Sequence, residues 1–280
     1  MNPLPSEPEQ PHWPPHQVVV GLGMLRAEPA HRAELETQLH FGARLRVLAA
    51  QGDWLHVEHA YDRYCGWIDR RSVSPLPEGW PAEEASDYFV TFEDLVLVSA
   101  TQWARLSYLA PVPVDAAGKL LPVGGQAWEP YDVAALRPAE QPTGLGLFML
   151  ARRFLGTPYL WGGCSLLGID CSGLTQLVAR RLGLWLPRNA SQQAQCGTAL
   201  DPLDREMGDL AFFSETPDGR ITHVGLVADD PQTIVHASGS VRIDRLTEAG
   251  IVHATTGVLT HHWAGLRRLT DTRGLHGLGL

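Results

Sequence analysis

The stretch "GIDCSGLTQLVARRLG", residues 168–183, decides the fold of the last part of the chain. Its apolar residues recur at the spacing of one helix face: Leu174, Leu177, Val178 and Leu182. Gly183 follows them, and glycine is typical of the position just after a helix. Cys171 stands at the other end, where the partial positive charge of a helix N-terminus stabilises a thiolate. The stretch therefore predicts a helix that begins with a reactive cysteine.

Around this stretch, helices come first and strands follow. The segment "GLFMLARRFLGTPYLWGG", residues 146–163, has helical spacing that stops at Gly156. Four later runs are short, β-rich and separated by turn residues: "GDLAFFS", "ITHVGLVAD", "TIVHAS" and "VRIDRL". This order favours an α+β domain with an antiparallel sheet over residues 146–272 and leaves no room for an alternating parallel sheet.

The chain before this domain reads as two small β-structures. Residues 16–76 alternate with period two between Gly and Asp turns, which indicates a small antiparallel barrel. Residues 86–137 repeat the pattern more loosely, and we interpret them as a second small barrel. Residues 1–15 form a proline-rich lead, and the Pro- and Gly-rich residues 138–145 form a linker.

Composition narrows the class of protein. The 280 residues are 44% hydrophobic and 19% charged, which is typical of a soluble protein of two or three domains. Lys and Arg number 22 against 31 Asp and Glu, so the net charge is −9 and a nucleic-acid partner is not expected. The N-terminus has no signal-peptide pattern, and no run reaches the roughly 18 apolar residues of a membrane span. We expect a cytoplasmic protein that contacts no membrane.

The four cysteines do not form a disulfide framework or a metal motif. They are widely spaced, with no C-x-x-C pair: Cys65, Cys164, Cys171 and Cys196. We expect free thiols, and neither a metal nor another cofactor.

Two histidines are candidate bases for the cysteine, because a cysteine nucleophile needs a base that a third group orients. His223 and His236 lie in consecutive predicted strands joined by "ADDP", residues 228–231. If these four residues are the hairpin loop, His223 lies directly opposite His236. Facing side chains in an antiparallel pair have Cβ atoms about 4.5–5.5 Å apart, so one ring could orient the other. Taken singly, each histidine fits a structural or solvent-exposed role better, and only Cys171, His223 and His236 together favour the chemistry.

These motifs together resemble the NlpC-type papain-like cysteine peptidases, which cleave bacterial cell-wall peptides. The resemblance rests on "PYLWGGCSLLGIDCSGLTQLV", "LPRNASQQ", "MGDLAFF" and "THVGLV…IVHAS", in family order over most of residues 146–245. It implies Cys171 as nucleophile, His223 as base and His236 as the third triad member. Tyr159 would contribute to the oxyanion hole, although on the residues alone it reads as an ordinary amphipathic tyrosine. Ser172 would line the substrate pocket.

The first predicted barrel, residues 16–76, resembles the bacterial SH3-like domain. The matching residues are Gln38, Gly42, Gly52 to Leu55, Val57, Tyr64, Gly66 and Trp67. Peptidases with such domains in front resemble γ-D-glutamyl-L-diamino-acid endopeptidases, which release L-Ala-γ-D-Glu from stem peptides with a free N-terminus. That resemblance implies that the first SH3-like domain walls off the pocket and that Tyr64 reaches it, with packing inside its own barrel as the alternative. An acidic partner could come from "EPAHRAELE", either Glu28 or Glu34.

Two positions depart from the family pattern. Asn189 stands where such members often carry an aspartate that pairs with the substrate ammonium, which puts selectivity for a free amine in doubt. Cys164 replaces the Thr or Ser that commonly follows "WGG", and we expect it to be a small buried residue.

The resulting hypothesis is murein peptide recycling by a thiolate at Cys171, expected to exist already in the resting enzyme. Two alternatives stay open at this stage. The chain could be a secreted remodeller of intact wall, or a catalytically silent module that binds wall peptides. Three further histidines are assigned to the surface: His253, His261 and His262.

Overall fold

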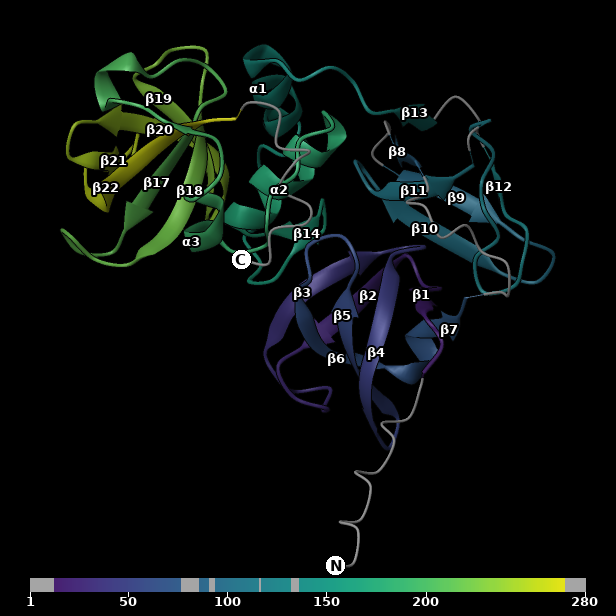
Figure 1. The fold of residues 1–280 in the computed structure, drawn as a ribbon. Coiled ribbons are helices and arrows are strands. Elements are labelled where there is room, and N and C mark those ends of the chain that lie inside the picture. Colours follow the sequence, from purple (N-terminus) through teal and green to yellow (C-terminus); the bar gives the residue numbers. More distant parts are fainter. Residues whose placement is uncertain (1–12, 77–85, 91–93, 116, 132–135, 270–280) are drawn as a thin grey trace, which may run out of the picture.

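The computed structural model describes residues 13–76, 86–90, 94–115, 117–131 and 136–269. Three parts of the predicted domains lie outside the described residues: most of the proline-rich lead, residues 91–93, 116 and 132–135 of the second segment, and the end of the last domain, 270–272. The described parts form three modules in chain order (Figure 1). No helix among them is long and apolar enough to span a bilayer.

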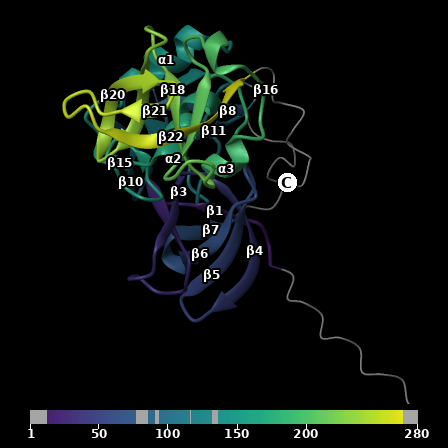
Figure 2. The ribbon, with the colours of Figure 1, turned by 90° about the vertical axis from the view of Figure 1, so that its left-hand side faces the viewer.

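The first module is a seven-stranded antiparallel sheet in the order β3-β2-β6-β5-β4-β1-β7. Its strands are β1 His16–Val18, β2 Leu22–Arg26, β3 Leu35–His40, β4 Arg44–Gln51, β5 Trp54–His59, β6 Cys65–Asp69 and β7 Val73–Pro75, with a 3-10 turn at Arg70–Ser72. Period-two alternation buries Leu25, Val57 and Ile68 completely on the inner face. Gly52 makes the β4–β5 turn with φ of 56°, a conformation that favours glycine. Figure 2 shows this module beneath the other two.

The second module consists of two three-stranded sheets around one core. The sheets have the orders β10-β9-β12 and β11-β8-β13. Their strands are β8 Ser86–Val90, β9 Asp94–Val98, β10 Trp103–Ser107, β11 Pro111–Val114, β12 Glu129–Pro130 and β13 Leu136–Pro138. Phe41 of the first module joins this core and meets Trp128 edge-on, with ring centroids 5.0 Å apart. The first two modules are therefore packed against each other.

The last module has helices first and an antiparallel sheet afterwards, in the order that the sequence predicts. Its first half contains α1 Gly144–Arg152, β14 Cys164–Ser165, β15 Gly168–Ile169, α2 Cys171–Arg181, α3 Ala190–Gln193, β16 Thr198–Ala199 and a 3-10 turn at Pro202–Asp204. The sheet is completed by β17 Leu210–Ser214, β18 Ile221–Val227, β19 Thr233–Ser238, β20 Ser240–Thr247, β21 Gly250–Val252 and β22 Leu259–Arg268. The strand order is β16-β22-β17-β18-β19-β20-β21, and β21 also pairs with β22.

Helix α2 is the central element of this module. It packs on the sheet beside β18, and almost every residue along it is buried. Leu174 and Val178 belong to the same core as Val224 and Val235 of the sheet. The helix ends before Gly183, whose φ is 70°. The stretch quoted first therefore forms the predicted helix.

The predicted β18–β19 register is wrong by two residues. Val227 opposes Ile234, and Gly225 opposes His236, instead of Val227 opposing Gln232. The reason is that the backbone N–H of Ala228 donates to the carbonyl of Thr233, which lengthens the ladder by one pair beyond Val227. Because a shift of two preserves the face of a strand, His223 and His236 still share one side of the sheet.

Candidate active site

Cys171 is the first residue of α2 and lies against strand β18. Asp170 caps the helix, accepting a hydrogen bond from the backbone N–H of Gly173 at 2.7 Å. The Cys171 Sγ atom is 4.0 Å from the carbonyl oxygen of Thr222, and the backbone N–H of Val224 also hydrogen-bonds it. The sulfur therefore lies beside the backbone on both sides of His223.

The two predicted histidines form a hydrogen-bonded pair. Nε2 of His223 is 2.9 Å from Nδ1 of His236, and the rings meet edge-on. They lie diagonally across the two strands, a separation that aromatic side chains can bridge. This bond leaves Nδ1 of His223 as the ring nitrogen available to a reacting group.

Asp244 is hydrogen-bonded to His236 and is a third member of this series of side chains, which was not predicted from the sequence. Its Oδ2 lies 3.0 Å from Nε2 of His236 and accepts a second bond from Arg242 Nε at 2.8 Å. Its Oδ1 accepts the backbone N–H of Ala254 at 2.9 Å. Burial alone would raise the pKa of Asp244, but these hydrogen bonds lower it well below its usual range. A carboxylate that stays charged can fix the tautomer and orientation of His236.

His261 also contacts the histidine pair, and its assignment to the surface was wrong. Its ring stacks on that of His223 with centroids 4.1 Å apart and planes 21° from parallel. It is half-buried on β22, and burial, followed by the charges of His236 and Arg242, lowers its pKa to about 4. His253 and His262 are half-buried as well. No sequence pattern indicates this contact, because β22 reaches the site only through the sheet order.

The surroundings of Cys171 and His223 favour their neutral forms over the thiolate expected in the resting enzyme. Burial, and after it the charge of Asp170, raises the pKa of Cys171 to about 12. Burial, together with His236 and His261, lowers the pKa of His223 well below its ordinary value. Desolvation and the capping carboxylate therefore favour the neutral thiol, and desolvation favours the neutral imidazole, against the helix N-terminus, which favours the thiolate.

Arg188 links the nucleophile helix to the first module. Its guanidinium forms a buried, two-pronged ion pair with Asp170 and donates to Thr37 Oγ1 at 2.7 Å. It also donates to Ser172 Oγ at 2.9 Å. Ser172, predicted to line the pocket, is thus buried in this network, which fixes the start of α2.

Tyr159, the predicted oxyanion donor, lies near enough to Cys171 for the two side chains to interact electrostatically. Its backbone N–H donates to Gly239 O at 2.9 Å, and its ring packs against the core that includes Cys171. Burial, followed by the charges of Cys171 and Asp170, raises the pKa of its phenol above the usual range. The hydroxyl therefore keeps its proton and can donate a hydrogen bond.

Tyr64 packs against the core of its own barrel, the alternative stated above, and its phenol also contacts the last module. Its phenol donates to Oε2 of Glu36 at 2.7 Å and hydrogen-bonds to the side chain of Asn189. The acidic partner is therefore Glu36, and neither Glu28 nor Glu34, which are both exposed. Glu36 is the last residue of the "EPAHRAELE" run, and its position in β3 two residues before buried Gln38 is the signal that could have singled it out.

Comparison with known proteins bears on the family of this chain. A model described as the NlpC/P60 family matches residues 156–260, and one described as the bacterial dipeptidyl-peptidase Sh3 domain matches residues 25–73. A γ-D-glutamyl-L-lysine dipeptidyl-peptidase of Bacillus subtilis is 30% identical over 206 residues, which cover 69% of each chain. The chain belongs to the NlpC/P60 family. The peptidase of the same name from Bacillus cereus is 27% identical over 258 residues, 84% of this chain and 75% of the relative.

A solved structure extends the likeness to the whole fold. A crystal structure of an NlpC/P60 family protein from Bacillus cereus superposes with a TM-score of 0.78, covering 91% of this chain and 99% of that chain at 22% identity. Members of the NlpC/P60 family are cysteine peptidases, so the Cys171 helix and the histidine pair lie in the domain whose family carries that chemistry.

Two remaining predictions concern the NlpC/P60 domain. Cys164 is buried, with its Sγ 3.6 Å from Thr37 Oγ1 and its backbone N–H donating to Gln38 Oε1 at 2.9 Å. It is a small residue at the contact between modules, as expected. Within the described residues, no three His, Cys, Asp or Glu side chains are grouped so that they could hold a metal ion.

Proposed function

We propose that this chain hydrolyses the bond between γ-D-Glu and the diamino acid of peptidoglycan stem peptides, releasing L-Ala-γ-D-Glu. The two relatives named above are γ-D-glutamyl-L-lysine dipeptidyl-peptidases. The observation that carries the proposal is the junction of two groups. Cys171 directly follows Asp170, which Arg188 binds, and Asn189 directly follows Arg188 and is hydrogen-bonded to Tyr64, which also binds Glu36.

In this proposal His223 accepts the Cys171 proton while the sulfur attacks the carbonyl carbon of the scissile amide. Tyr159 O–H and the Cys171 N–H stabilise the oxyanion, each donor contributing on the order of 3 kcal/mol. His223 then gives the proton to the leaving amine, and the acyl group stays on sulfur. A water molecule, deprotonated by His223, attacks the thioester and releases the dipeptide and the free thiol.

The substrate's N-terminal ammonium would bind at Glu36. Asn189 cannot supply a negative charge, but the Glu36 carboxylate beside it can, and a hydrogen bond between charged groups is roughly twice as strong as a neutral one. Tyr64 holds Glu36 in place. We propose that this pair makes the enzyme select peptides with a free L-Ala terminus.

Three finer assignments belong to this proposal. Residues 86–137, with their two packed sheets, are proposed as a second SH3-like domain. A role in murein recycling and a cytoplasmic location follow as predictions, which cell fractionation tests. Recovery of the protein with the envelope fraction would favour the remodelling of intact wall.

Mass spectrometry of a matched peptide set tests the activity. L-Ala-γ-D-Glu-L-Lys, its diaminopimelate counterpart and N-acetylated copies of both are incubated with the enzyme and with Cys171→Ala. We expect L-Ala-γ-D-Glu from the free-amine peptides only, and only with Cys171 intact. Cleavage of the N-acetylated peptides as well would support the peptidase activity and refute the selectivity for a free amine. No cleavage of any peptide would favour a silent binding module.

A further inference from the structure

His261 is in closer ring contact with His223 than its hydrogen-bonded partner His236. The ring centroids of His261 and His223 lie 4.1 Å apart, against 5.1 Å for His236 and His223. The planes of the stacked rings are 21° from parallel, so His261 covers one face of the His223 imidazole. His236 instead meets this ring at its edge, through Nε2 of His223. His223 is therefore held on one edge by a hydrogen bond and on one face by a flat ring.

The stack joins two strands that are not neighbours in the sheet. His223 lies on β18 and His261 on β22, with β17 between them. Phe213 of β17 is fully buried and contacts both rings, with centroids 6.2 Å from His223 and 6.5 Å from His261. Nδ1 of His261 lies 2.9 Å from Oγ1 of Thr260. A core side chain and a hydrogen bond within its own strand therefore hold the His261 ring over His223.

His261 is also the outermost of the three imidazoles. His236 is 0% exposed and His223 is 6% exposed, whereas His261 is half-buried. Burial is the largest cause of the lowered pKa of His223, followed by the charges of His236 and His261. Because a stacked ring keeps water off the face that it covers, His261 supplies part of that burial.

The surroundings of His261 favour its neutral form. Burial, followed by the charges of His236 and Arg242, lowers its pKa to about 4, although the charge of Asp244 acts in the opposite direction. In the proposed reaction His223 takes up the thiol proton and becomes a cation. A second cation on His261 would repel it, whereas the face of a neutral aromatic ring attracts a cation. His261 can therefore remain stacked while His223 carries the proton.

We propose that His261 is a positioning residue for the general base: its ring fixes the plane of the His223 imidazole and keeps water from one face of it. Nδ1 of His223, the nitrogen that the bond to His236 leaves available, is thereby held in one orientation for the reacting thiol. The proposal rests on the cysteine-peptidase chemistry of the proposed function, but it does not depend on which peptide is cleaved.

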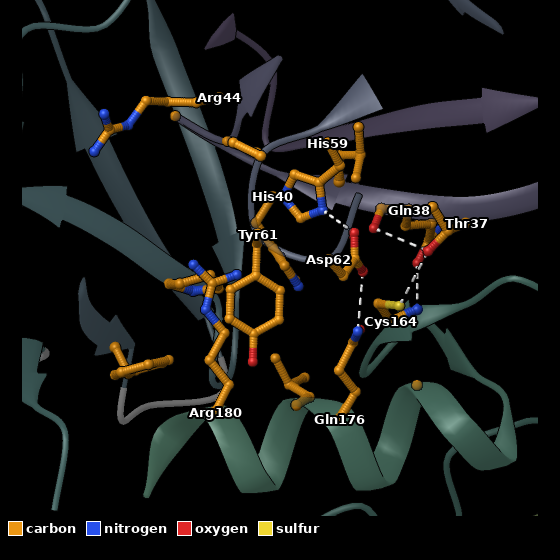
Figure 3. A pocket seen from close by; sticks show the side chains of 18 of the residues that line it. Thr37, Gln38, His40, Arg44, His59, Tyr61, Asp62, Cys164, Gln176 and Arg180 are labelled. Atoms are coloured by element: carbon orange, nitrogen blue, oxygen red, sulfur yellow. Dashed lines mark hydrogen bonds and ion pairs between the residues drawn. The ribbon is translucent and has the colours of Figure 1, made fainter. Parts of the chain in front are cut away.

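Two buried histidines of the first module have a different environment. His40 and His59 line a pocket between that module and another face of α2, which Gln176 also lines (Figure 3). Nδ1 of His59 lies 2.8 Å from Oδ1 of Asp62. The histidines whose charges lower the pKa of His223 are instead His236 and His261. The positioning role is therefore assigned to the ring on β22.

NMR titration of His223 tests this covering role without any substrate. In the full-length protein with 15N-labelled histidine, a His223→Gln variant identifies the His223 signals by their loss. His261→Ala opens one face of His223 to water, so the pKa of His223 should rise toward the ordinary value of about 6.5. His261→Phe keeps a flat ring in place, and the pKa of His223 should stay well below that value. An unchanged pKa in His261→Ala would overturn the proposal.

Kinetics with L-Ala-γ-D-Glu-L-Lys test the positioning. His261→Ala should lower kcat about 3- to 10-fold, the range that one aromatic contact contributes, with little change in KM. His261→Phe should keep kcat within about twofold of the wild type, because the stacked ring remains. His262→Ala, at the next position of β22 and also half-buried, is the matched control and should retain the wild-type kcat.

Equal losses of kcat in His261→Ala and His261→Phe would show that a flat ring is not what the site requires, and would overturn the proposal. If the wild type cleaves no peptide, the proposed function fails on its own, and the NMR titration decides the role of His261.

Discussion

At the scale of single residues, the balance of burial against charge decides the chemistry of Cys171. The helix N-terminus and Arg188 favour a thiolate, but the Cys171 residue is only 6% exposed and Asp170 adds a negative charge nearby. His223 is held neutral by the same burial and by its two neighbouring imidazoles. Proton transfer from sulfur to nitrogen is therefore expected to accompany substrate binding or attack, and not to precede it.

The first prediction concerns the pH dependence of Cys171 alkylation. Its pKa is raised to about 12, so in the free enzyme the thiolate fraction should increase about tenfold per pH unit throughout pH 6–10. Iodoacetamide labelling of the Cys171 peptide, followed by mass spectrometry, measures this rate separately from that of exposed Cys65. A rate that levels off between pH 5 and pH 8 would instead indicate a preformed thiolate–imidazolium pair.

The second prediction concerns Asp244. Asp244→Asn keeps the size of the side chain but removes the charge that orients His236. The loss of one hydrogen bond to a charged group, roughly 1.5–3 kcal/mol, corresponds to a fall in kcat of about 10- to 100-fold with little change in KM.

Asp229→Asn, on the exposed β18–β19 loop, is the matched control and should behave like the wild type. If Asp244 acts through His236, then Asp244→Asn should add no further loss to His236→Ala. Full additivity of the two losses would refute that positioning role.

At the scale of elements, period-two alternation predicted the shared face of His223 and His236, although the register was wrong. A shift of two residues preserves the face, so the pairing of the rings survived the error. Asp244 lies on β20, which follows β19 directly and pairs with it through a tight hairpin, so the same hairpin count could have placed it near His236. His261 could not be predicted in this way, because it lies on β22, and only the sheet order brings that strand to the two histidines. A single sequence shows the alternation within each strand, but it does not show which distant strands lie next to each other in the sheet.

The third prediction follows from the observed register. Gly225 lies opposite His236, and a Cβ at that position would come within 2.9 Å of His236 Cβ and 2.8 Å of Ile234 Cδ1. Gly225→Ala must therefore displace His236 and weaken its bond to His223. We expect kcat to fall at least tenfold while the free energy of unfolding changes by only about 1–3 kcal/mol. Gly265→Ala, where nothing lies within 4 Å, is the control; equal activity in both variants would contradict the mechanism.

At the scale of the whole molecule, the first module is joined to the peptidase domain by direct polar contacts. Gln38 N donates to Gly162 O at 3.0 Å, Gln176 Nε2 to Asp62 at 3.0 Å, and Trp185 Nε1 to Tyr61 O at 2.9 Å. The family resemblance predicted that Tyr64 would cross this contact. It did not single out Glu36, because choosing among acidic residues of one run requires knowing which strand face meets the other module.

The fourth prediction separates recognition by the first module from catalysis by the last. Glu36→Gln removes the proposed partner of the substrate ammonium and should lower kcat/KM for L-Ala-γ-D-Glu-L-Lys about 10- to 100-fold, with no loss for the N-acetylated peptide. Asn189→Asp adds a carboxylate beside Tyr64. It should raise kcat/KM for the free-amine peptide relative to kcat/KM for the N-acetylated peptide. Glu34→Gln changes an exposed carboxylate of the same run and should leave both peptides unaffected. If Glu36→Gln lowered both kcat/KM values equally, Glu36 would serve the packing of the two modules, and selectivity for a free amine would have to come from another residue.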